Sequence, residues 1–319
     1  MDVPTFADVL AARRRIAPYL RPTPLYRYPA LDAVAGTEVW VKHENHQPIG
    51  AFKVRGGVNL MSRLPEEDRR RGVATASTGN HGQSIAWAGR LFGVPVLVCV
   101  PEGANPVKVE AMRLLGATVL AHGPDFEAAR EYCERLAEKE GRRYVHVANE
   151  PDLIAGVATE SLEIFEEQSD VEVLVVPVGG GSGASGACLV RRAVRPATEV
   201  VAVQAEAAPA GQRSWQAGRV VQAPMATAAE GMATASGYEL PQRILRELLD
   251  DFVLVSEEAM RAAALTMIEK TRNLVELSGA APLAAVLADP PRFAGRKVAL
   301  VCTGGNVSPA QLRDLLNAG

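Results

Sequence analysis

Lys53 is the first residue of this 319-residue chain whose type and surroundings suit covalent chemistry. It follows Phe52, and no acidic residue lies close to it in the sequence. Partial burial lowers the pKa of a lysine and frees its amine to form a Schiff base with a carbonyl compound. Most lysines are solvated instead, so this position is weak evidence until other motifs support it.

The segment Ser77-Thr78-Gly79-Asn80-His81-Gly82 is a second motif, placed between a short apolar run (72–76) and a predicted helix. The first N–H groups of a helix have no intrahelical partner and lie at the positive end of its dipole. They therefore suit an anion such as a carboxylate. An N-capped loop without a ligand explains this segment equally well when it is considered alone.

A glycine run, residues 179–186, is the third motif and follows a predicted buried strand. Its backbone N–H groups suit a phosphate, but it lacks the lysine of a nucleoside-triphosphate loop. Gly181, Gly183 and Gly186 fit the dinucleotide fingerprint of dehydrogenases. Glu199, however, precedes the next strand instead of ending it, which argues against that class.

Thr303 is the fourth position, at the end of an apolar strand and before Gly304 and Gly305. A hydroxyl beside two glycines can approach a ring nitrogen closely. An ordinary turn between a strand and a helix is the simpler explanation of this motif alone.

Short apolar runs alternate with helical patterns along most of the chain, which predicts a parallel sheet with helices on both faces. Three of the four motifs directly follow a predicted strand, and sites gather at the carboxyl ends of such strands. The alanine-rich segment 205–235 is the least regular, either a mobile loop over the site or a surface connection. We predict strands at 39–42, 72–76, 94–100, 117–121, 171–178, 199–205 and 297–302, and helices at 53–63, 81–92, 105–115 and 125–140.

Composition excludes several classes of protein. A net charge of −3 and an aromatic fraction of 5% argue against nucleic-acid binding, and the arginine runs 13–15 and 69–71 suit solvated helix surfaces. No stretch resembles a signal peptide or a membrane span, so we expect a cytoplasmic protein that does not bind membranes. The four cysteines have no CxxC spacing and predict neither a disulfide framework nor a zinc site: Cys99, Cys133, Cys188 and Cys302.

Together, in this order and spacing, the four motifs resemble those of the fold type II family of pyridoxal-phosphate (PLP) enzymes, the tryptophan-synthase β-like group. The resemblance covers nearly the whole chain. It is strongest to serine/threonine dehydratases and serine racemases, since related synthases usually carry Thr where His81 stands. It implies an α/β fold of two open twisted lobes with mainly parallel sheets and the cofactor in the cleft between them. The implied domains are a large PLP-binding domain, 1–72 plus 149–319, and a small substrate-carboxylate-binding domain, 73–148.

The resemblance also implies a role for each motif residue. Lys53 would form the Schiff base with pyridoxal 5'-phosphate and take the substrate Cα proton, with Phe52 against the pyridine ring. Asn80 would bind the ring hydroxyl, and Thr303 would face the ring nitrogen. The phosphate would lie on Gly179, Gly180, Gly181, Ser182 and Gly183. The substrate carboxylate would lie on Ser77, Thr78, Gly79, Asn80 and His81.

Departures from the family pattern modify these expectations. Ile49 and Ala51 replace two hydroxyl residues before the lysine. Thr78 stands where serine racemases carry a serine as second base, which lowers the expectation of racemase activity. His46, Glu230 and Glu276 have open roles. Where some relatives bind a divalent cation through acidic side chains, this chain has Gln204, Ala208 and Ala210, so no metal is expected.

The function implied by the resemblance is a PLP-dependent ammonia-lyase acting on a β-hydroxy-α-amino acid, L-threonine (to 2-oxobutanoate) or L-serine (to pyruvate). Since no regulatory domain follows Gly319, the chain resembles the short, catabolic type. Alternatives are a lyase for threo-3-hydroxyaspartate or a hydroxyectoine-pathway intermediate, and a serine racemase-like enzyme. A dinucleotide-binding dehydrogenase and a non-catalytic amino-acid-binding relative are weaker ones. A homodimer or homotetramer is expected.

Overall fold

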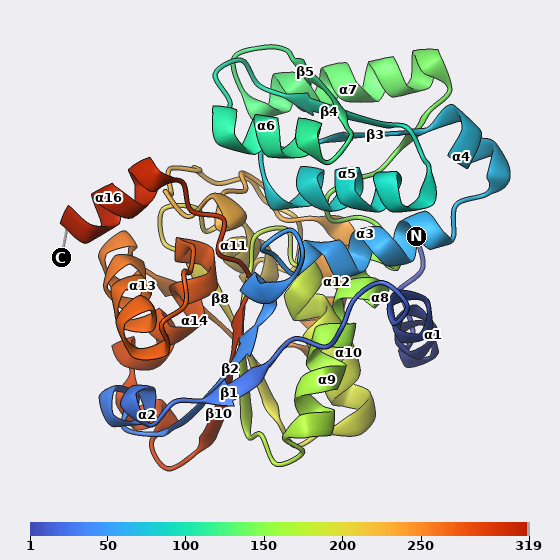
Figure 1. Ribbon diagram of the computed structural model, residues 1–319. Helices are drawn as coiled ribbons and strands as arrows, with labels where there is room; N and C mark the ends of the chain where they lie inside the picture. The colour runs from blue at the N-terminus through green and yellow to red at the C-terminus, as the bar shows by residue number, and fades with distance from the viewer. Residues whose placement is uncertain (318–319) are drawn as a thin grey trace.

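The computed structural model describes residues 1–317, which form two β-sheets of unequal size with helices packed on both (Figure 1). The larger sheet has the strand order β1-β2-β10-β7-β8-β9 and the smaller one β5-β4-β3-β6. Neighbouring strands are parallel except β1 and β2. The strands are β1 Leu25–Arg27, β2 Glu38–His43, β3 Val73–Ala76, β4 Val96–Val100, β5 Thr118–Ala121, β6 Arg143–Tyr144, β7 Val173–Pro177, β8 Glu199–Ala205, β9 Asp251–Val255 and β10 Lys297–Cys302.

Helices cover both faces of each sheet, as expected for a doubly wound α/β fold. In Figure 1, α5, α6 and α7 flank the smaller sheet, α13 and α14 lie on one side of the larger sheet, and α9, α10 and α12 lie on the other. The helices are α1 Phe6–Ile16, α2 Pro29–Ala35, η1 Glu44–His46, α3 Lys53–Ser62, α4 Glu66–Arg71, α5 Asn80–Phe92, α6 Pro106–Leu114, α7 Phe126–Glu140, α8 Pro151–Val157, α9 Thr159–Glu167, α10 Ser182–Val194, α11 Ala210–Gln216, η2 Glu230–Met232, α12 Glu239–Leu248, α13 Glu257–Thr271, α14 Leu277–Ala288, α15 Pro290–Phe293 and α16 Pro309–Asn317.

The strands in the middle of the larger sheet are apolar because both of their faces are covered. Every residue of β7 is buried, and alternate side chains enter two different cores. Val173 and Val175 pack toward α13 and α14, while Leu174 and Val176 pack toward α10. This continuous burial explains why these strands read as unbroken apolar runs in the sequence.

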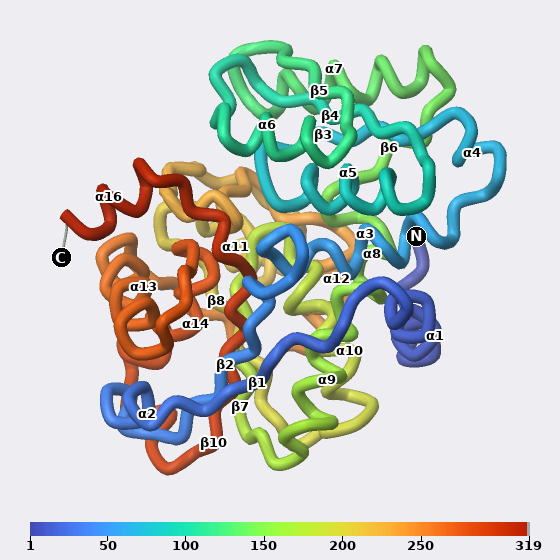
Figure 2. Tube along the Cα trace, viewed as in Figure 1, coloured from blue at the N-terminus to red at the C-terminus, as the bar shows by residue number. Residues whose placement is uncertain are grey.

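The smaller sheet is built from one continuous part of the chain. Its four strands come from residues 73–144, and Figure 2 shows this part as a separate group of elements above the larger sheet. The assignment of 73–148 as a domain stays a prediction.

Three strands end beside the motifs that the sequence singled out. β3 ends at Ala76 before Ser77, β7 ends at Pro177 before the glycine run, and β10 ends at Cys302. In the larger sheet, β10 is parallel to β7, so their carboxyl ends lie at the same edge. The topology thus brings the glycine run and Thr303 to one place.

Candidate active site

A cavity of about 410 Å³ lies at the carboxyl ends of these strands. It is lined by elements of both sheets and by segments far apart in the sequence. Every residue for which the sequence predicted a site role is part of its wall: Phe52, Lys53, Ser77, Thr78, Gly79, Asn80, His81, Gly179, Gly180, Gly181, Ser182, Gly183 and Thr303. Their individual roles stay predictions.

The loop before Lys53 is joined to the loop after β10. The Phe52 N–H donates to the Thr303 carbonyl at 3.0 Å, and the Gly305 N–H donates to the Gly50 carbonyl at 3.0 Å. Ala51 and Gly304 form an antiparallel bridge between these contacts. A short two-stranded pairing therefore sets the separation of the lysine and the threonine.

Lys53 opens helix α3, and its amine reaches across the cavity to the glycine run. Its Nζ donates to the Ser182 Oγ at 3.0 Å and lies 5.1 Å from the centre of the Phe52 ring. Burial lowers the pKa of Lys53 to about 8, although Glu160 acts in the opposite direction. Roughly a tenth of the amine is therefore unprotonated at pH 7, as a nucleophile or base requires.

The glycine run forms a cradle that larger residues would fill. Gly181 has a φ of 91° and caps the N-terminus of α10. A Cβ at Gly179 would lie 2.1 Å from the Gly231 carbonyl oxygen, and one at Gly183 would lie 3.3 Å from the Phe52 ring. The backbone therefore lies open at a helix N-terminus, where N–H groups suit a phosphate. An amine with a lowered pKa next to this cradle fits pyridoxal phosphate.

The loop before α5 has its own pattern of N–H groups. The Ser77 Oγ accepts hydrogen bonds from the N–H groups of Gly79 at 3.2 Å and Gly82 at 2.9 Å. Within residues 1–317, the N–H groups of Thr78, Asn80 and His81 have no partner. Ser77 thus shapes the turn and uses the Gly79 N–H itself, while the three free N–H groups suit a carboxylate.

The imidazole ring of His81 is hydrogen-bonded inside the protein and is not placed to act as an acid or a base. The Thr75 hydroxyl donates its single proton to the Val145 carbonyl at 2.8 Å and therefore accepts from the His81 Nε2, 3.0 Å away. Burial, with Lys53 nearby, lowers the pKa of His81 to about 3. The imidazole stays neutral, so any contact of His81 with a substrate anion would involve its N–H group in the backbone.

Glu276 joins Asn80 to the segment after β10. Its Oε1 accepts from the Asn80 Nδ2 at 2.9 Å and from the Ser278 hydroxyl at 2.7 Å, and its Oε2 accepts from the Asn306 N–H at 3.2 Å. The Asn306 side chain also donates to the Asn80 Oδ1 at 2.8 Å. Burial raises the pKa of Glu276. Asn80 is therefore held in one orientation from two sides.

Several residues of the cavity wall escaped the sequence analysis. Lys108 of α6 forms an ion pair with Glu230, a residue whose role the sequence left open. Lys108 also lies beside Gly79, because a Cβ there would be 3.8 Å from its Nζ. His46, the third open residue, is exposed and bonds to Asn273 at 2.6 Å. Further wall residues without a sequence signal are Asp125, Phe126, Val147, Met225, Thr234 and Tyr238.

Part of the irregular segment 205–235 belongs to the wall as well, through Met225 and Glu230 among others. Its mobility stays a prediction. Gln204, one of the three positions from which no metal was expected, accepts at its Oε1 from the Gln212 N–H at 3.0 Å. None of the helices within residues 1–317 combines the length and the apolar character that crossing a bilayer needs.

Comparison with known proteins gives consistent results. A family model described as "Pyridoxal-phosphate dependent enzyme" matches residues 16–304. The L-threonine ammonia-lyase of Thermotoga maritima is 38% identical over 318 residues, covering 99% of this chain and 79% of that protein. The L-threo-3-hydroxyaspartate ammonia-lyase of Saccharomyces cerevisiae is 34% identical, covering 99% and 98%. The crystal structure of serine racemase from Dictyostelium discoideum has a TM-score of 0.90 at 33% identity, covering 96% and 99%.

Proposed function

Because the chain belongs to the fold type II family of pyridoxal-phosphate-dependent enzymes, we propose that it is an ammonia-lyase for L-threonine and L-serine. The observation that carries the substrate choice is the makeup of the cavity wall beyond the cofactor-binding motifs. When bound, pyridoxal phosphate withdraws electrons from the amino acid, which makes the Cα proton acidic. The residues of this chain bind, orient and move protons around that centre.

Lys53 and the glycine run would hold the cofactor. The Lys53 amine would bind it covalently, and the N–H groups at the start of α10 would receive the phosphate. When it is not bound to the cofactor, the Lys53 Nζ would take the Cα proton of the substrate. Its lowered pKa keeps part of the amine ready for this step near neutral pH.

The substrate carboxylate would lie on the free N–H groups of Thr78, Asn80 and His81. The N–H groups of Asn80 and His81 belong to the first turn of α5 and that of Thr78 directly precedes its N-cap, where the helix dipole favours negative charge. Lys108 lies beside Gly79 at the same place, but its charge is paired with that of Glu230, so the N–H groups are the main anchor. Two anchored points, the amine and the carboxylate, then leave the substrate side chain facing the rest of the cavity.

The wall that remains for the side chain suits a small neutral group. Phe126, Val147 and Met225 offer apolar surface for the methyl group of threonine. Asp125 would repel a second carboxylate, and the charge of Lys108 is balanced by Glu230. No arginine lines the cavity among the described residues, so a dicarboxylic substrate has no free cation to bind. This favours threonine and serine over hydroxyaspartate.

The proposal is tested by measuring 2-oxo acid and ammonia from single β-hydroxy amino acids. We expect L-threonine and L-serine to give 2-oxobutanoate and pyruvate, each with one ammonia. A kcat/KM that is highest for L-threo-3-hydroxyaspartate would overturn the substrate choice. Interconversion of L- and D-serine without net ammonia release would indicate a racemase instead, and Lys53→Ala should abolish every one of these reactions.

We also propose that the chain forms a homodimer or homotetramer in the cytoplasm and that its domains divide as 1–72 with 149–319, and 73–148. Light scattering on the purified protein measures its oligomeric state. Limited proteolysis, which cuts between folded units, tests the domain boundaries.

A further inference from the structure

Glu160, in helix α9, is a fully buried carboxyl group that the proposed reaction does not use. Neither of its oxygen atoms has a hydrogen-bond partner within residues 1–317. A Cβ on Gly183 would be within 3.5 Å of the Glu160 Oε1, the Phe52 ring and Val176, so the surroundings of that glycine are largely apolar. A buried polar group without a partner is costly, and an apolar side chain would pack here without that cost.

The position of this carboxyl relates it to the reactive amine. The Glu160 Oε1 lies 3.5 Å from where a Cβ of Gly183 would stand, close to the edge of the Phe52 ring. Gly183 directly follows Ser182, the hydrogen-bond partner of Lys53, and Phe52 directly precedes Lys53. Glu160 and the contact between Lys53 and Ser182 therefore both adjoin Gly183.

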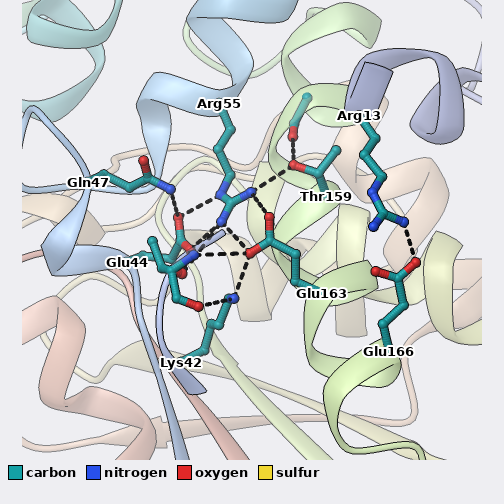
Figure 3. Close-up of polar contacts among 10 residues, drawn as sticks. Arg13, Lys42, Glu44, Gln47, Arg55, Thr159, Glu163 and Glu166 are labelled. Atoms are coloured by element: carbon teal, nitrogen blue, oxygen red, sulfur yellow. Dashed lines mark hydrogen bonds and ion pairs between the residues drawn. The ribbon is translucent and has the colours of Figure 1, made fainter. Parts of the chain in front are cut away.

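A neighbouring network of buried ions is already balanced without Glu160 (Figure 3). Arg55 binds Glu44 at 2.7 Å and Glu163 at 2.6 Å, and Lys42 binds Glu163 at 2.6 Å. Two positive and two negative side chains thus compensate one another. An ionised Glu160 would add an unmatched negative charge to the interior, unless a further cation balances it.

Lys53 is the cation that can do so. The charged groups that face Glu160 come from β2, η1, α3 and α9, and α10 carries no charged side chain before Arg191. Lys42 and Arg55 are already paired with Glu44 and Glu163, which leaves Lys53. Its single polar contact, the hydroxyl of Ser182, does not compensate a positive charge.

We propose that Glu160 is a positioning residue that acts through Lys53, because the two groups share one titrating proton and the ionised carboxylate keeps the amine protonated. The directions of their titration agree. Burial raises the pKa of Glu160 well above its usual range and lowers that of Lys53, while Glu160 opposes the latter shift. Two buried ionisable groups that interact by more than about one pKa unit titrate as a pair. The consequence for catalysis rests on the proposed function, but the shared proton does not.

The test measures the Lys53 amine directly in the full-length protein after hydroxylamine has removed the cofactor. Isotope-labelled formaldehyde with a mild borane methylates unprotonated amines, and mass spectrometry of the Lys53 peptide gives the rate along a pH series. We expect Glu160→Gln to shift the midpoint to lower pH by about half to one unit, which is a roughly two- to fivefold faster methylation at pH 7. Glu160→Asp, which keeps the charge, should restore part of the wild-type profile.

Glu166→Gln is the matched control, because Glu166 lies on the same helix but is exposed and paired with Arg13 (Figure 3). Its profile should equal that of the wild type. An unchanged midpoint in Glu160→Gln overturns the proposal. If that variant does not fold, Glu160→Met replaces it with the same expected shift. A missing lyase activity of the wild type, with the midpoint shift present, would contradict only the proposed function.

Discussion

Neutralising Glu163 should destabilise the fold far more than neutralising another carboxylate on the same helix. Glu163 accepts from Arg55 Nη1 at 2.6 Å, Arg55 Nη2 at 2.7 Å and Lys42 Nζ at 2.6 Å. Arg55 and Lys42 are fully buried or nearly so, with 1% and 0% of their side chains exposed. Glu163→Gln would leave these two cations with Glu44 alone. Removing one partner of a buried ion pair costs about 3–5 kcal/mol.

The control is again Glu166→Gln, whose partner is Arg13. Both side chains of this pair are nearly half exposed, 45% for Arg13 and 44% for Glu166. Exposed pairs contribute about 0–1 kcal/mol, since water screens them. The assay is urea unfolding of the holoenzyme followed by circular dichroism, with the free energies of unfolding compared at equal slope.

The difference between the two variants should thus be at least about 2 kcal/mol, from the two ranges above. A Glu163→Gln variant within 1 kcal/mol of Glu166→Gln, with an unchanged slope, would refute the reasoning. It would mean that the buried cations find other acceptors or water. Acid should also destabilise the fold. Although burial acts in the opposite direction, Arg55 lowers the pKa of Glu44 in the folded protein. The ionised Glu44 therefore stabilises the fold above its unfolded-state pKa, and this stabilisation is lost as the pH falls through its folded-state pKa.

Three further predictions concern the cavity. Gly179→Ala should lower the affinity for pyridoxal phosphate at least about tenfold, as equilibrium dialysis can measure. The reason is that the new Cβ would lie 2.1 Å from the Gly231 carbonyl oxygen. An affinity equal to that of the wild type would show that the loop can move to accommodate the methyl group. The kcat at saturating substrate, measured when the Lys53 amine is free of the cofactor, should rise with pH toward about 8 as that amine loses its proton, and a flat profile over this range would contradict a base with that pKa. Thr78→Ala should abolish any exchange of the Cα proton that leads to D-serine while ammonia release persists, as chiral chromatography can measure; persistent D-serine would place the second base elsewhere.

The predicted strands and helices agree with the structure where burial is continuous. Strands 199–205 and 297–302 were predicted with their observed bounds, since each contains an unbroken apolar run, 200–203 and 298–302. The short strands β1 and β6 and the edge strand β9 were missed. β1 and β6 are too short to show a local pattern and depend on pairing with a neighbour, whereas β9 contains the apolar run 252–255, whose composition is typical of a strand.

The site was predictable to the extent that it follows strand ends. Parallel strands deliver Thr303 and the glycine run to one edge, and the hydroxyl and glycine residues there have a visible sequence pattern. Lys108 and Glu160 have no such pattern, because each lies inside a helix and reaches its place through tertiary packing. His81 shows the converse limit: its motif was visible, but the hydrogen bond that turns its ring toward Thr75 was not.

Because the loop before Lys53 is paired with the loop after Thr303, the two loops cannot move independently of each other. A change that displaces one backbone carries the other along, so an error in placing the amine becomes the same error in placing the hydroxyl. Selection on either position therefore constrains both, and a compensating substitution for damage at one end of the chain can arise more than two hundred residues away.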